Sequence, residues 1–292
     1  MSDINWVLDH IGIASRDLNL AQSTYQRLGF RLTARSIHAG AVEPGGPVVP
    51  WGSGNHCAML DDGYIELLGI VDASLPSSAA AMLERYEGAH IVAFGCDDAD
   101  NAYAALRERE PRTRAPAALE RDAPFGEHDE STRRAKFRNI YLEPDAFPPA
   151  KLIFIEHGTP DVLWQPHLCK HPNTATSLVE VALCTDDVPG TAEHLAKMLN
   201  VEADHKSPDV ASLDVERGRV YLLSPKMVPS WAKDVQPPAV PSVVGLGVGV
   251  RDLDTCKSLL DTAGVEFESH PYPAIWVRPS QTLGPVLSFI QV

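Results

Sequence analysis

The stretch LDHIGIASRDLNLAQSTYQRLGF, residues 8–30, decides the fold, because VGLGVGVRDLDTCKSLLDTAGVEF at residues 244–267 repeats its pattern. In both stretches a short apolar run leads into Arg-Asp-Leu, and a helical periodicity then ends before a glycine. Arg16 aligns with Arg251 at an offset of 235 positions, and the apolar positions on either side align without a gap. Such agreement indicates an internal repeat.

Two further copies follow the same order of apolar strand, aspartate and helical stretch. They are HIVAFGCDDADNAYAALRE from His90 and EVALCTDDVPGTAEHLAKML from Glu180. Each of the four copies has an aspartate seven places after its first residue, namely Asp17, Asp97, Asp187 and Asp252. A carboxylate at a helix start accepts hydrogen bonds from free backbone N–H groups. Each copy therefore predicts a strand that turns directly into a helix.

Segments with strand character come after each helical stretch, at residues 56–70, 135–156, 210–224 and 274–292. We therefore predict an α+β fold of four βαβββ modules, at about 7–70, 88–160, 178–225 and 242–292. Pro-rich connections predict two paired-module domains, 1–160 and 178–292. A polar insertion at 111–149 is predicted as a loop, either a lid over a site or plain surface.

The composition excludes several classes of protein. With 44% hydrophobic residues, 22% charged residues and no apolar run of membrane-spanning length, the chain is predicted to be globular, with no membrane partner. The formal net charge of −14 argues against nucleic acid as a partner. Five scattered cysteines and the absence of a signal-like start predict a cytoplasmic location. The basic strip at 131–138 is predicted to be a solvated loop.

The first two modules carry a pair of imidazoles and a pair of carboxylates in matching places. His10 and His90 open the first strand of their modules, and Glu66 and Glu156 lie in the last strand, between apolar neighbours. An unpaired carboxylate in such surroundings is costly, and one bound cation would satisfy all four groups. Four N and O ligands suit Zn, Ni, Co, Mn or Fe. We therefore predict one divalent metal site formed by His10, Glu66, His90 and Glu156.

The last two modules lack this ligand set. Their equivalent positions are Glu180 with Tyr221, and Gly245 with Ser288 or a neighbour. The second half is therefore predicted to keep the scaffold and to have lost the metal site.

The segments HIGIASRDLNLAQSTYQRLGF, WGSGNHCAMLDDGYIELLGI and LIFIEHG together resemble the vicinal oxygen chelate superfamily, in particular its glyoxalase-like members. The resemblance is strong for residues 7–70, fair for 88–160, and limited to the module pattern beyond about 178. It implies that His10, Glu66, His90 and Glu156 bind one divalent ion, and that Glu156 is both ligand and catalytic base.

The resemblance also implies a reaction and a substrate class. The expected activity is that of a metal-dependent lyase or isomerase, which stabilises an enediolate-like intermediate of a small α-hydroxycarbonyl or ketoacid substrate. Two alternatives stay open: an extradiol-type Fe(II) ring-cleaving dioxygenase, and non-enzymatic drug or small-molecule binding of the bleomycin-resistance type. Fold alone does not choose among them. A monomer or a homodimer is compatible with all three.

Several other side chains are candidates for the cleft. Trp51 and Asn55, in the glyoxalase-like segment WGSGNH, are predicted to bind substrate, as is Phe125 in a nearby loop. The arginines Arg133, Arg134 and Arg138 are weaker candidates for an anionic substrate group. The histidines of the Pro-rich connection, His157, His167 and His171, are predicted to lie at the surface because their spacing is irregular.

Overall fold

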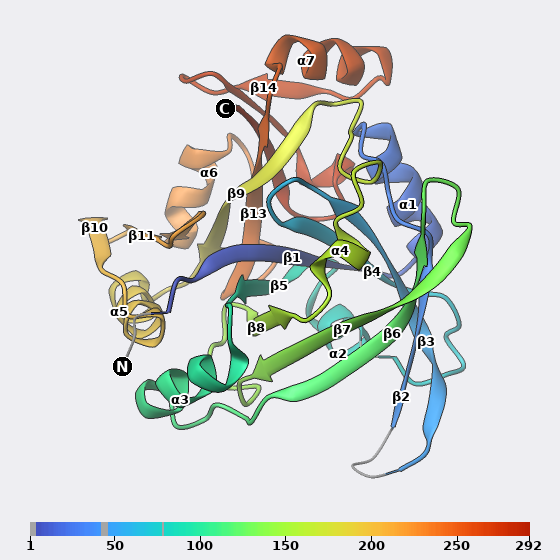
Figure 1. Cartoon of the computed structure of the whole chain (residues 1–292). Coiled ribbons are helices and arrows are strands. Elements are labelled where there is room, and N and C mark those ends of the chain that lie inside the picture. Colours follow the sequence, from blue (N-terminus) through green and yellow to red (C-terminus); the bar gives the residue numbers. More distant parts are fainter. Residues whose placement is uncertain (1–3, 42–45, 78) are drawn as a thin grey trace.

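The computed structural model describes residues 4–41, 46–77 and 79–292, and contains two eight-stranded mixed sheets (Figure 1). The first has the strand order β2-β3-β4-β1-β5-β8-β7-β6 and the second β10-β11-β12-β9-β13-β16-β15-β14. The strands of the first sheet are β1 (Val7–Ser15), β2 (Ser36–Ala41), β3 (Val48–Met59), β4 (Tyr64–Ile70), β5 (Gly88–Gly95), β6 (Ala117–Phe125), β7 (Ser131–Tyr141) and β8 (Lys151–His157).

The second sheet and the helices complete the chain. The sheet contains β9 (Ala175–Cys184), β10 (Ala203–Ser207), β11 (Val210–Asp214), β12 (Arg219–Leu223), β13 (Ser242–Val250), β14 (Phe267–Ser269), β15 (Ala274–Val277) and β16 (Val286–Gln291). The helices are α1 (Leu18–Arg27), α2 (Ala80–Arg85), α3 (Ala99–Arg109), α4 (Pro160–Leu163), α5 (Val188–Leu199), α6 (Val228–Trp231) and α7 (Leu253–Thr262), with short 3-10 turns at Pro225–Met227 and Pro279–Gln281.

Each sheet is made of two modules joined through their first strands. In the first sheet β1 is parallel to β4, β5 is parallel to β8, and β1 pairs with β5 in the antiparallel sense. The second sheet repeats this arrangement with β9, β12, β13 and β16. The predicted α+β fold with four βαβββ modules is therefore confirmed. No helix among the described residues has the length and apolar character needed to cross a membrane.

An aspartate caps the first helix of every module, but the second module uses a different one from the predicted residue. Asp17, Asp187 and Asp252 accept hydrogen bonds from backbone N–H groups at the starts of α1, α5 and α7, as expected. In α3 the cap is Asp98, whose carboxylate accepts from two backbone N–H groups at 2.9 Å. The prediction of Asp97 was wrong by one residue, and this shift also changes the alignment of the site.

The predicted loop at 111–149 contains a β-hairpin, formed by β6 and β7 and seen in green in Figure 1. Its polar sequence is compatible with strands because charges of opposite sign face each other across the pair: Glu120 is opposite Lys136, and Asp122 is opposite Arg134. The basic strip at 131–138 therefore belongs to strand β7 rather than to a loop.

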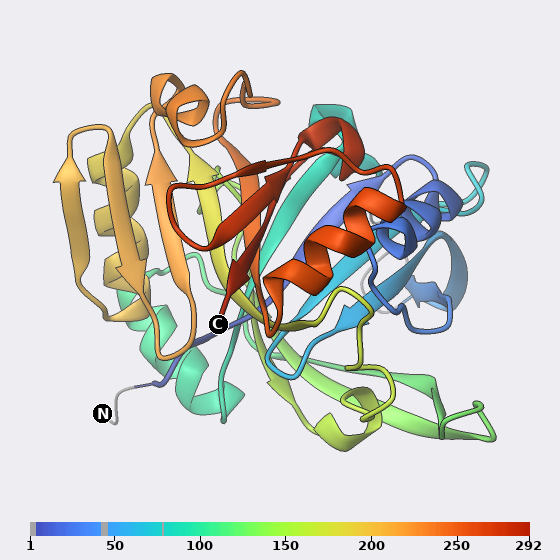
Figure 2. The same cartoon turned by 90° about the horizontal axis from the view of Figure 1, so that it is seen from above.

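The largest apolar core is shared by the two halves of the chain. It contains side chains from both sheets and from α1, α3, α5 and α7. Figure 2 shows the two sheets side by side, with the first strands of both halves near the middle of the molecule. One example of contact between the halves is the ring of Phe30, which stacks on Phe289 with centroids 6.0 Å apart. The predicted boundaries 1–160 and 178–292 separate the two sheets along the sequence, but they do not separate two cores.

The two sheets differ on the face that does not contribute to the shared core. On the first sheet this face carries a smaller apolar cluster, including Ile91 and Ile153, and is partly covered by Met82 and Leu83 of α2. On the second sheet the same face is packed against α6 and the residues that follow it. At this place the first sheet borders a cavity, whereas the second sheet is covered by α6 and the residues that follow it.

Candidate functional site

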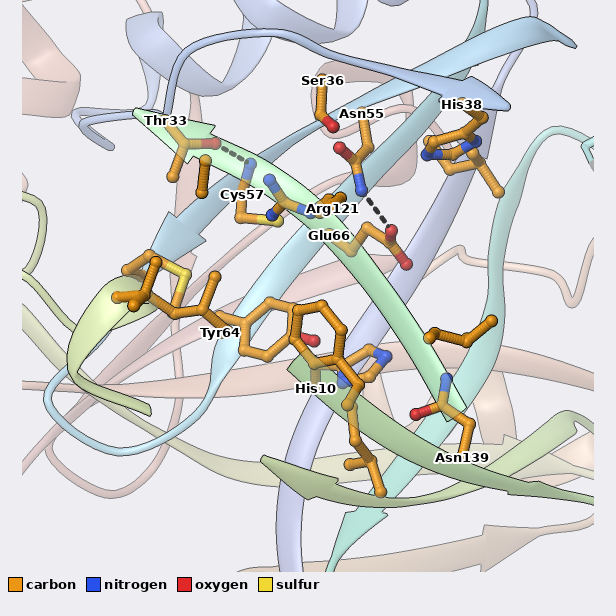
Figure 3. Close-up of a pocket in the computed structure, with 18 of the residues that line it drawn as sticks. His10, Thr33, Ser36, His38, Asn55, Cys57, Tyr64, Glu66, Arg121 and Asn139 are labelled. Carbon is orange, nitrogen blue, oxygen red and sulfur yellow. Dashed lines mark hydrogen bonds between the residues drawn. The ribbon is translucent and has the colours of Figure 1, made fainter. Parts of the chain in front are cut away.

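The candidate site is a cavity of about 400 Å³ on the first sheet (Figure 3). This volume is within the range of small-molecule sites in proteins. Both modules of the first half contribute to its wall: His10, Asn55, Tyr64 and Glu66 come from β1, β3 and β4, and Arg121 and Asn139 come from β6 and β7. Apolar residues of β5, β8 and α2 form much of the remaining wall.

His10 is held by a buried carboxylate. Its Nδ1 lies 2.7 Å from Asp9 Oδ1, and the other oxygen of Asp9 lies 3.0 Å from His157 Nε2. Burial alone would raise the pKa of the Asp9 carboxyl, but the hydrogen bonds with His10 and His157 outweigh it and keep this pKa well below its usual range. An ionised Asp9 keeps the proton on His10 Nδ1, so Nε2 is the ring nitrogen with a free lone pair.

Aromatic contacts fix the position of this imidazole. The His10 ring stacks on Tyr64, with centroids 4.4 Å apart, and Tyr64 also meets the edge of Trp164. Burial raises the pKa of the Tyr64 hydroxyl, as do the nearby charges of Asp9 and Glu66, so it stays protonated. Burial also raises the pKa of the Cys57 thiol to about 12, so the cysteine of this cavity is not a thiolate nucleophile at neutral pH.

Glu66 is a carboxylate in the cavity wall. Its Oε1 accepts a hydrogen bond of 2.6 Å from Asn55 Nδ2. Figure 3 shows the Glu66 side chain directed into the cavity above His10 and Tyr64. Glu66 lies opposite Gly12 on β1 and His10 lies opposite Tyr64, so the two groups come from adjacent strands, two positions apart. Trp51, which was predicted with Asn55 to bind substrate, also lines the cavity.

The other two predicted metal ligands lie elsewhere. His90 Nε2 bonds to the backbone oxygen of Tyr86 at 2.9 Å, and its ring stacks on the Tyr86 ring. His90 lines a second hollow and is not among the residues that line the main cavity. The Glu156 carboxylate accepts the backbone N–H of Ala99 at the start of α3 and lies 3.5 Å from Arg138. Glu156 therefore accepts a hydrogen bond at the start of α3 and is not part of the cavity wall.

The second module is shifted by one residue relative to the predicted alignment, and this shift explains why His90 and Glu156 lie outside the cavity. Because the caps Asp17 and Asp98 are equivalent, the counterpart of His10 is Ile91 and not His90. The strand pairing agrees: His10 is opposite Tyr64 in the first module, and Ile91 is opposite Lys151 in the second. By the same register the counterpart of Glu66 is Ile153. A shift of one residue in a strand changes which side chains reach a given face.

The predicted four-ligand metal site is therefore not assembled. Only His10 and Glu66 of the four residues line the cavity, and the second module places isoleucines where the other two ligands would be needed. In the part of the chain that the structure describes, no group of three or more His, Cys, Asp or Glu side chains is arranged to hold a metal ion. The donor set does not fit the ion that the resemblance implied.

Other predicted residues are also placed by the structure. Phe125 ends β6 and lies under the guanidinium of Arg133, 3.6 Å from the ring centroid, but it is not among the residues that line the cavity. Arg138 forms an ion pair with Asp100 at 2.5 Å, so its guanidinium is engaged outside the cavity. Two histidines of the Pro-rich connection are not at the surface, contrary to the prediction: His157 bonds to Asp9, and His171 is buried.

Sequence reasoning missed Asp9, Tyr64, Arg121 and Asn139. The one local signal was the acidic residue directly before His10 in LDHIG, because a carboxylate beside a histidine is a common partner for its ring. The others are ordinary strand residues until the sheet curves and brings them to one cavity.

The second half is packed differently at the position that corresponds to His10. Gly245 is the counterpart of His10, and a Cβ atom there would collide with the indole of Trp231 in α6. The structure thus gives a physical reason for the glycine: the aromatic ring fills the place that a side chain takes in the first module. Glu180, the third counterpart, stays in the sheet, and burial raises its pKa to about 7.

Comparison with known proteins identifies the family. A family model described as a glyoxalase-like domain matches residues 8–199, so the chain belongs to the glyoxalase-like domain family, within the vicinal oxygen chelate superfamily that its sequence resembled. No curated protein matches the sequence.

Solved structures share the fold over nearly the whole chain. A hypothetical protein from Staphylococcus aureus is similar with a TM-score of 0.64 and 12% identity, over 98% of this chain and 100% of the other. A xylose isomerase-like TIM barrel/4-hydroxyphenylpyruvate dioxygenase fusion protein gives 0.59 and 12% over 99% of this chain and 49% of the other. A triple mutant of 4-hydroxymandelate synthase from Streptomyces coelicolor gives 0.54 and 14% over 99% and 93%. At these identities the likeness concerns the fold alone.

Proposed function

We propose that this protein is an isomerase or lyase that moves a proton on a small polar molecule bound in the cavity of the first sheet. The observation that carries the proposal is the Asp9–His10 pair, with an Nδ1 to Oδ1 distance of 2.7 Å, at the wall of a cavity that also holds Glu66. A histidine held in one tautomer by a buried carboxylate is a general base of the kind used in many enzymes.

Two side chains of this chain, His10 and Glu66, carry the proton steps of the proposed reaction. His10 Nε2 removes a proton from a carbon next to a carbonyl, which leaves an imidazolium stabilised by Asp9 and an enolate on the substrate. Return of a proton to the neighbouring atom, from His10 or from Glu66, completes an isomerisation. Loss of a leaving group from the neighbouring carbon completes an elimination instead. Two proton carriers on adjacent strands support either outcome.

The apolar wall assists this chemistry. Ile91, Ile153 and Leu68 line the cavity and keep bulk water away from part of the bound molecule. Electrostatic interactions inside such a site are stronger than in water, so the Asp9–His10 pair stabilises developing charge more effectively. The cavity is thus suited to a molecule with both an apolar part and a polar reacting end.

The test is solvent proton exchange. The purified protein in D2O is incubated with phenylpyruvate, 2-oxobutanoate and 2-hydroxyacetophenone, and loss of the C–H signal next to the carbonyl is followed by proton NMR against protein-free blanks. We expect enzyme-dependent exchange with at least one of them. His10→Gln should lower the rate by about a hundredfold or more, because the base is lost. Asp9→Asn should lower it by roughly a hundredfold, because the tautomer changes.

Two further variants separate this proposal from the four-ligand metal interpretation. If His90 and Glu156 were metal ligands, His90→Gln and Glu156→Gln would abolish exchange as His10→Gln does. Because both side chains lie outside the cavity, we expect each variant to exchange at a rate near that of the original protein, provided that thermal unfolding shows that the variant is folded. Exchange that is unaffected by His10→Gln, or tight binding of all three compounds with no exchange, would contradict the proposal; the second result would point to a binding protein.

A further inference from the structure

The buried carboxylate of Asp9 has a second imidazole on its other side. His157, in β8, lies with Nε2 3.0 Å from Asp9 Oδ2, while His10 Nδ1 lies 2.7 Å from Asp9 Oδ1. The three side chains are almost completely enclosed, with 6% of Asp9, 5% of His10 and 11% of His157 exposed. His157 is not among the residues that line the cavity. Any effect that it has on a bound molecule therefore passes through Asp9.

Three aromatic side chains fix the orientation of the His157 ring. The ring of Trp164 lies at 89° to it with centroids 4.8 Å apart, and Phe137 and Tyr64 meet it at 5.6 and 6.4 Å. Its Nδ1 is buried and has no hydrogen-bond partner within the ranges that the structure describes. A proton on Nδ1 would be a buried donor without an acceptor, which is costly. The single proton of a neutral His157 therefore belongs on Nε2, where Asp9 accepts it.

The two histidines consequently carry their protons on different ring nitrogens. Burial raises the pKa of the Asp9 carboxyl, but the hydrogen bonds with His10 and His157 lower it by more, so Asp9 is ionised and each of its oxygens accepts one N–H group. His10 then has the proton on Nδ1, and His157 has it on Nε2. A buried carboxylate with only one donor would keep more of its desolvation cost. The second donor reduces this cost and holds the carboxylate in one orientation.

Strand alternation explains why His157, and not Glu156, takes this place. Adjacent residues of a strand point to opposite faces, and β8 pairs with β7 in regular register at both positions. Glu156 accepts the backbone N–H of Ala99 at the start of α3. Its neighbour His157 therefore faces the other side of the sheet, where Asp9 lies.

We propose that His157 is a positioning residue for the reaction at His10: its Nε2–H donates to Asp9 Oδ2 and fixes the carboxylate so that Oδ1 holds the proton of His10 Nδ1. This inference rests on the proposed function, because it concerns the same reaction. His10 Nε2 is then the nitrogen that accepts a proton from the substrate. As positive charge forms on the His10 ring, the donor on Oδ2 makes Asp9 less basic, so the Nδ1 proton stays on His10 and Asp9 stays a carboxylate.

The first test reads the proton positions without any substrate. The ring nitrogens of His10 and His157 are observed by NMR in the full-length protein labelled with 15N-histidine, and are assigned with His10→Gln and His157→Gln. We expect His10 to be protonated at Nδ1 and unprotonated at Nε2, and His157 to show the reverse. A neutral His157 protonated at Nδ1 would overturn the inference, whatever reaction the protein performs.

The second test compares two variants of His157 in the solvent exchange reaction. A glutamine N–H group can donate to Asp9 Oδ2 as Nε2–H does, whereas phenylalanine fills the same space without a donor. His157→Phe should lower kcat by about tenfold or more, with KM within about twofold because the cavity wall is unchanged. Its His10 signals should show a mixture of tautomers. His157→Gln should recover kcat to within about threefold of the original protein, together with the Nδ1–H tautomer of His10.

His205→Phe is the matched control, since it removes an imidazole that lies 2.7 Å from Glu193 at the surface. It should change neither kcat nor the His10 signals. A folded His157→Phe that exchanges at the original rate, or that keeps His10 in one tautomer, would overturn the inference. If His157→Phe does not fold, loss of exchange in His157→Gln with the His10 tautomer retained would do the same.

The two proposals fail separately. Absence of exchange with every compound would remove the proposed function, whereas the proton positions on His10 and His157 are read without substrate and decide whether His157 holds Asp9. A role of His157 in stability alone would lower the unfolding midpoint of His157→Phe, but it would leave the His10 tautomer of the folded variant unchanged.

Discussion

One structural position carries a different residue in each of the four modules, and the chemistry of the chain follows from that difference. It is His10 in the first module, Ile91 in the second, Glu180 in the third and Gly245 in the fourth. His10 has Asp9 beside it and a cavity in front of it, so it is available for catalysis. Ile91 forms apolar wall, and Gly245 makes room for Trp231. Glu180 is a half-buried ionisable group.

Glu180 gives a prediction about stability and pH. Burial raises its pKa from 4.5 to about 7, so its neutral form favours the folded state fully below pH 4.5, and this contribution is lost as the pH rises through 7. Glu180→Gln should therefore leave stability nearly unchanged at pH 4. At pH 8 it should raise the free energy of unfolding by up to about 3 kcal/mol. Urea unfolding at both values measures the difference, and a gain that is equal at pH 4 and pH 8 would contradict the assignment.

At the scale of elements, the start of α3 decides how the second module aligns with the first. The sequence offers two adjacent aspartates, and N-cap chemistry accepts either of them. In the folded chain Asp98 makes the cap, while Asp97 is exposed and has no cap bond. Strand β5 consequently presents Ile91, rather than His90, at the place of His10. Adjacent residues of a strand point to opposite faces unless a bulge intervenes, so His90 and Ile91 do not both face the cavity.

This assignment predicts an asymmetric pair of variants. Asp98→Ala should lower the free energy of unfolding by about 1 kcal/mol, the usual cost of losing an N-cap carboxylate. Asp97→Ala, its neighbour and control, should cost less than about 0.5 kcal/mol because it is an exposed position without such a bond. Denaturant unfolding of the two variants beside the original chain provides the measurement. The reverse order of costs would restore the alignment in which His90 is the counterpart of His10.

At the scale of the whole molecule, the shared core makes the second half a support for the site in the first. Phe289 of β16 is fully buried and stacks on Phe30, and the Tyr25 hydroxyl of α1 donates to the backbone oxygen of Thr282 at 3.2 Å. These contacts join the end of α1 to the last module. The second half completes the hydrophobic core on which the first sheet rests.

Phe289→Ala tests this dependence. Removal of a fully buried ring should lower the free energy of unfolding by about 3–5 kcal/mol. Because the core is common to both halves, we expect one transition, with the same midpoint by far-ultraviolet circular dichroism and by tryptophan fluorescence. Leu20→Ala, at a residue that is 50% exposed, is the control and should change stability little. Two separate transitions, with the first half unaffected by the variant, would show that the halves are independent.

The repeat of strand, aspartate and helix was enough to predict the four modules, because N-caps and apolar periodicity depend on residues that are close in sequence. The same local logic singled out His10, Glu66, Trp51 and Asn55, all in the first module, and the structure places these four residues in the cavity wall. The roles predicted for them stay predictions. It was less successful at residues 111–149. There the strands β6 and β7 are stabilised by pairing with each other and with β8, and their own sequence is too polar to indicate a strand.

What the sequence by itself determined is the module pattern, the family resemblance and half of the candidate site, since each depends on patterns that short segments carry alone. The tertiary structure decided the rest. Strand register placed His90 and Glu156 outside the cavity, and pairing between distant strands brought Arg121 and Asn139 into the same cavity wall as His10 and Glu66. Register and curvature arise from pairing and packing between segments far apart in the sequence, so a residue's neighbours along the chain do not reveal which cavity its side chain will face.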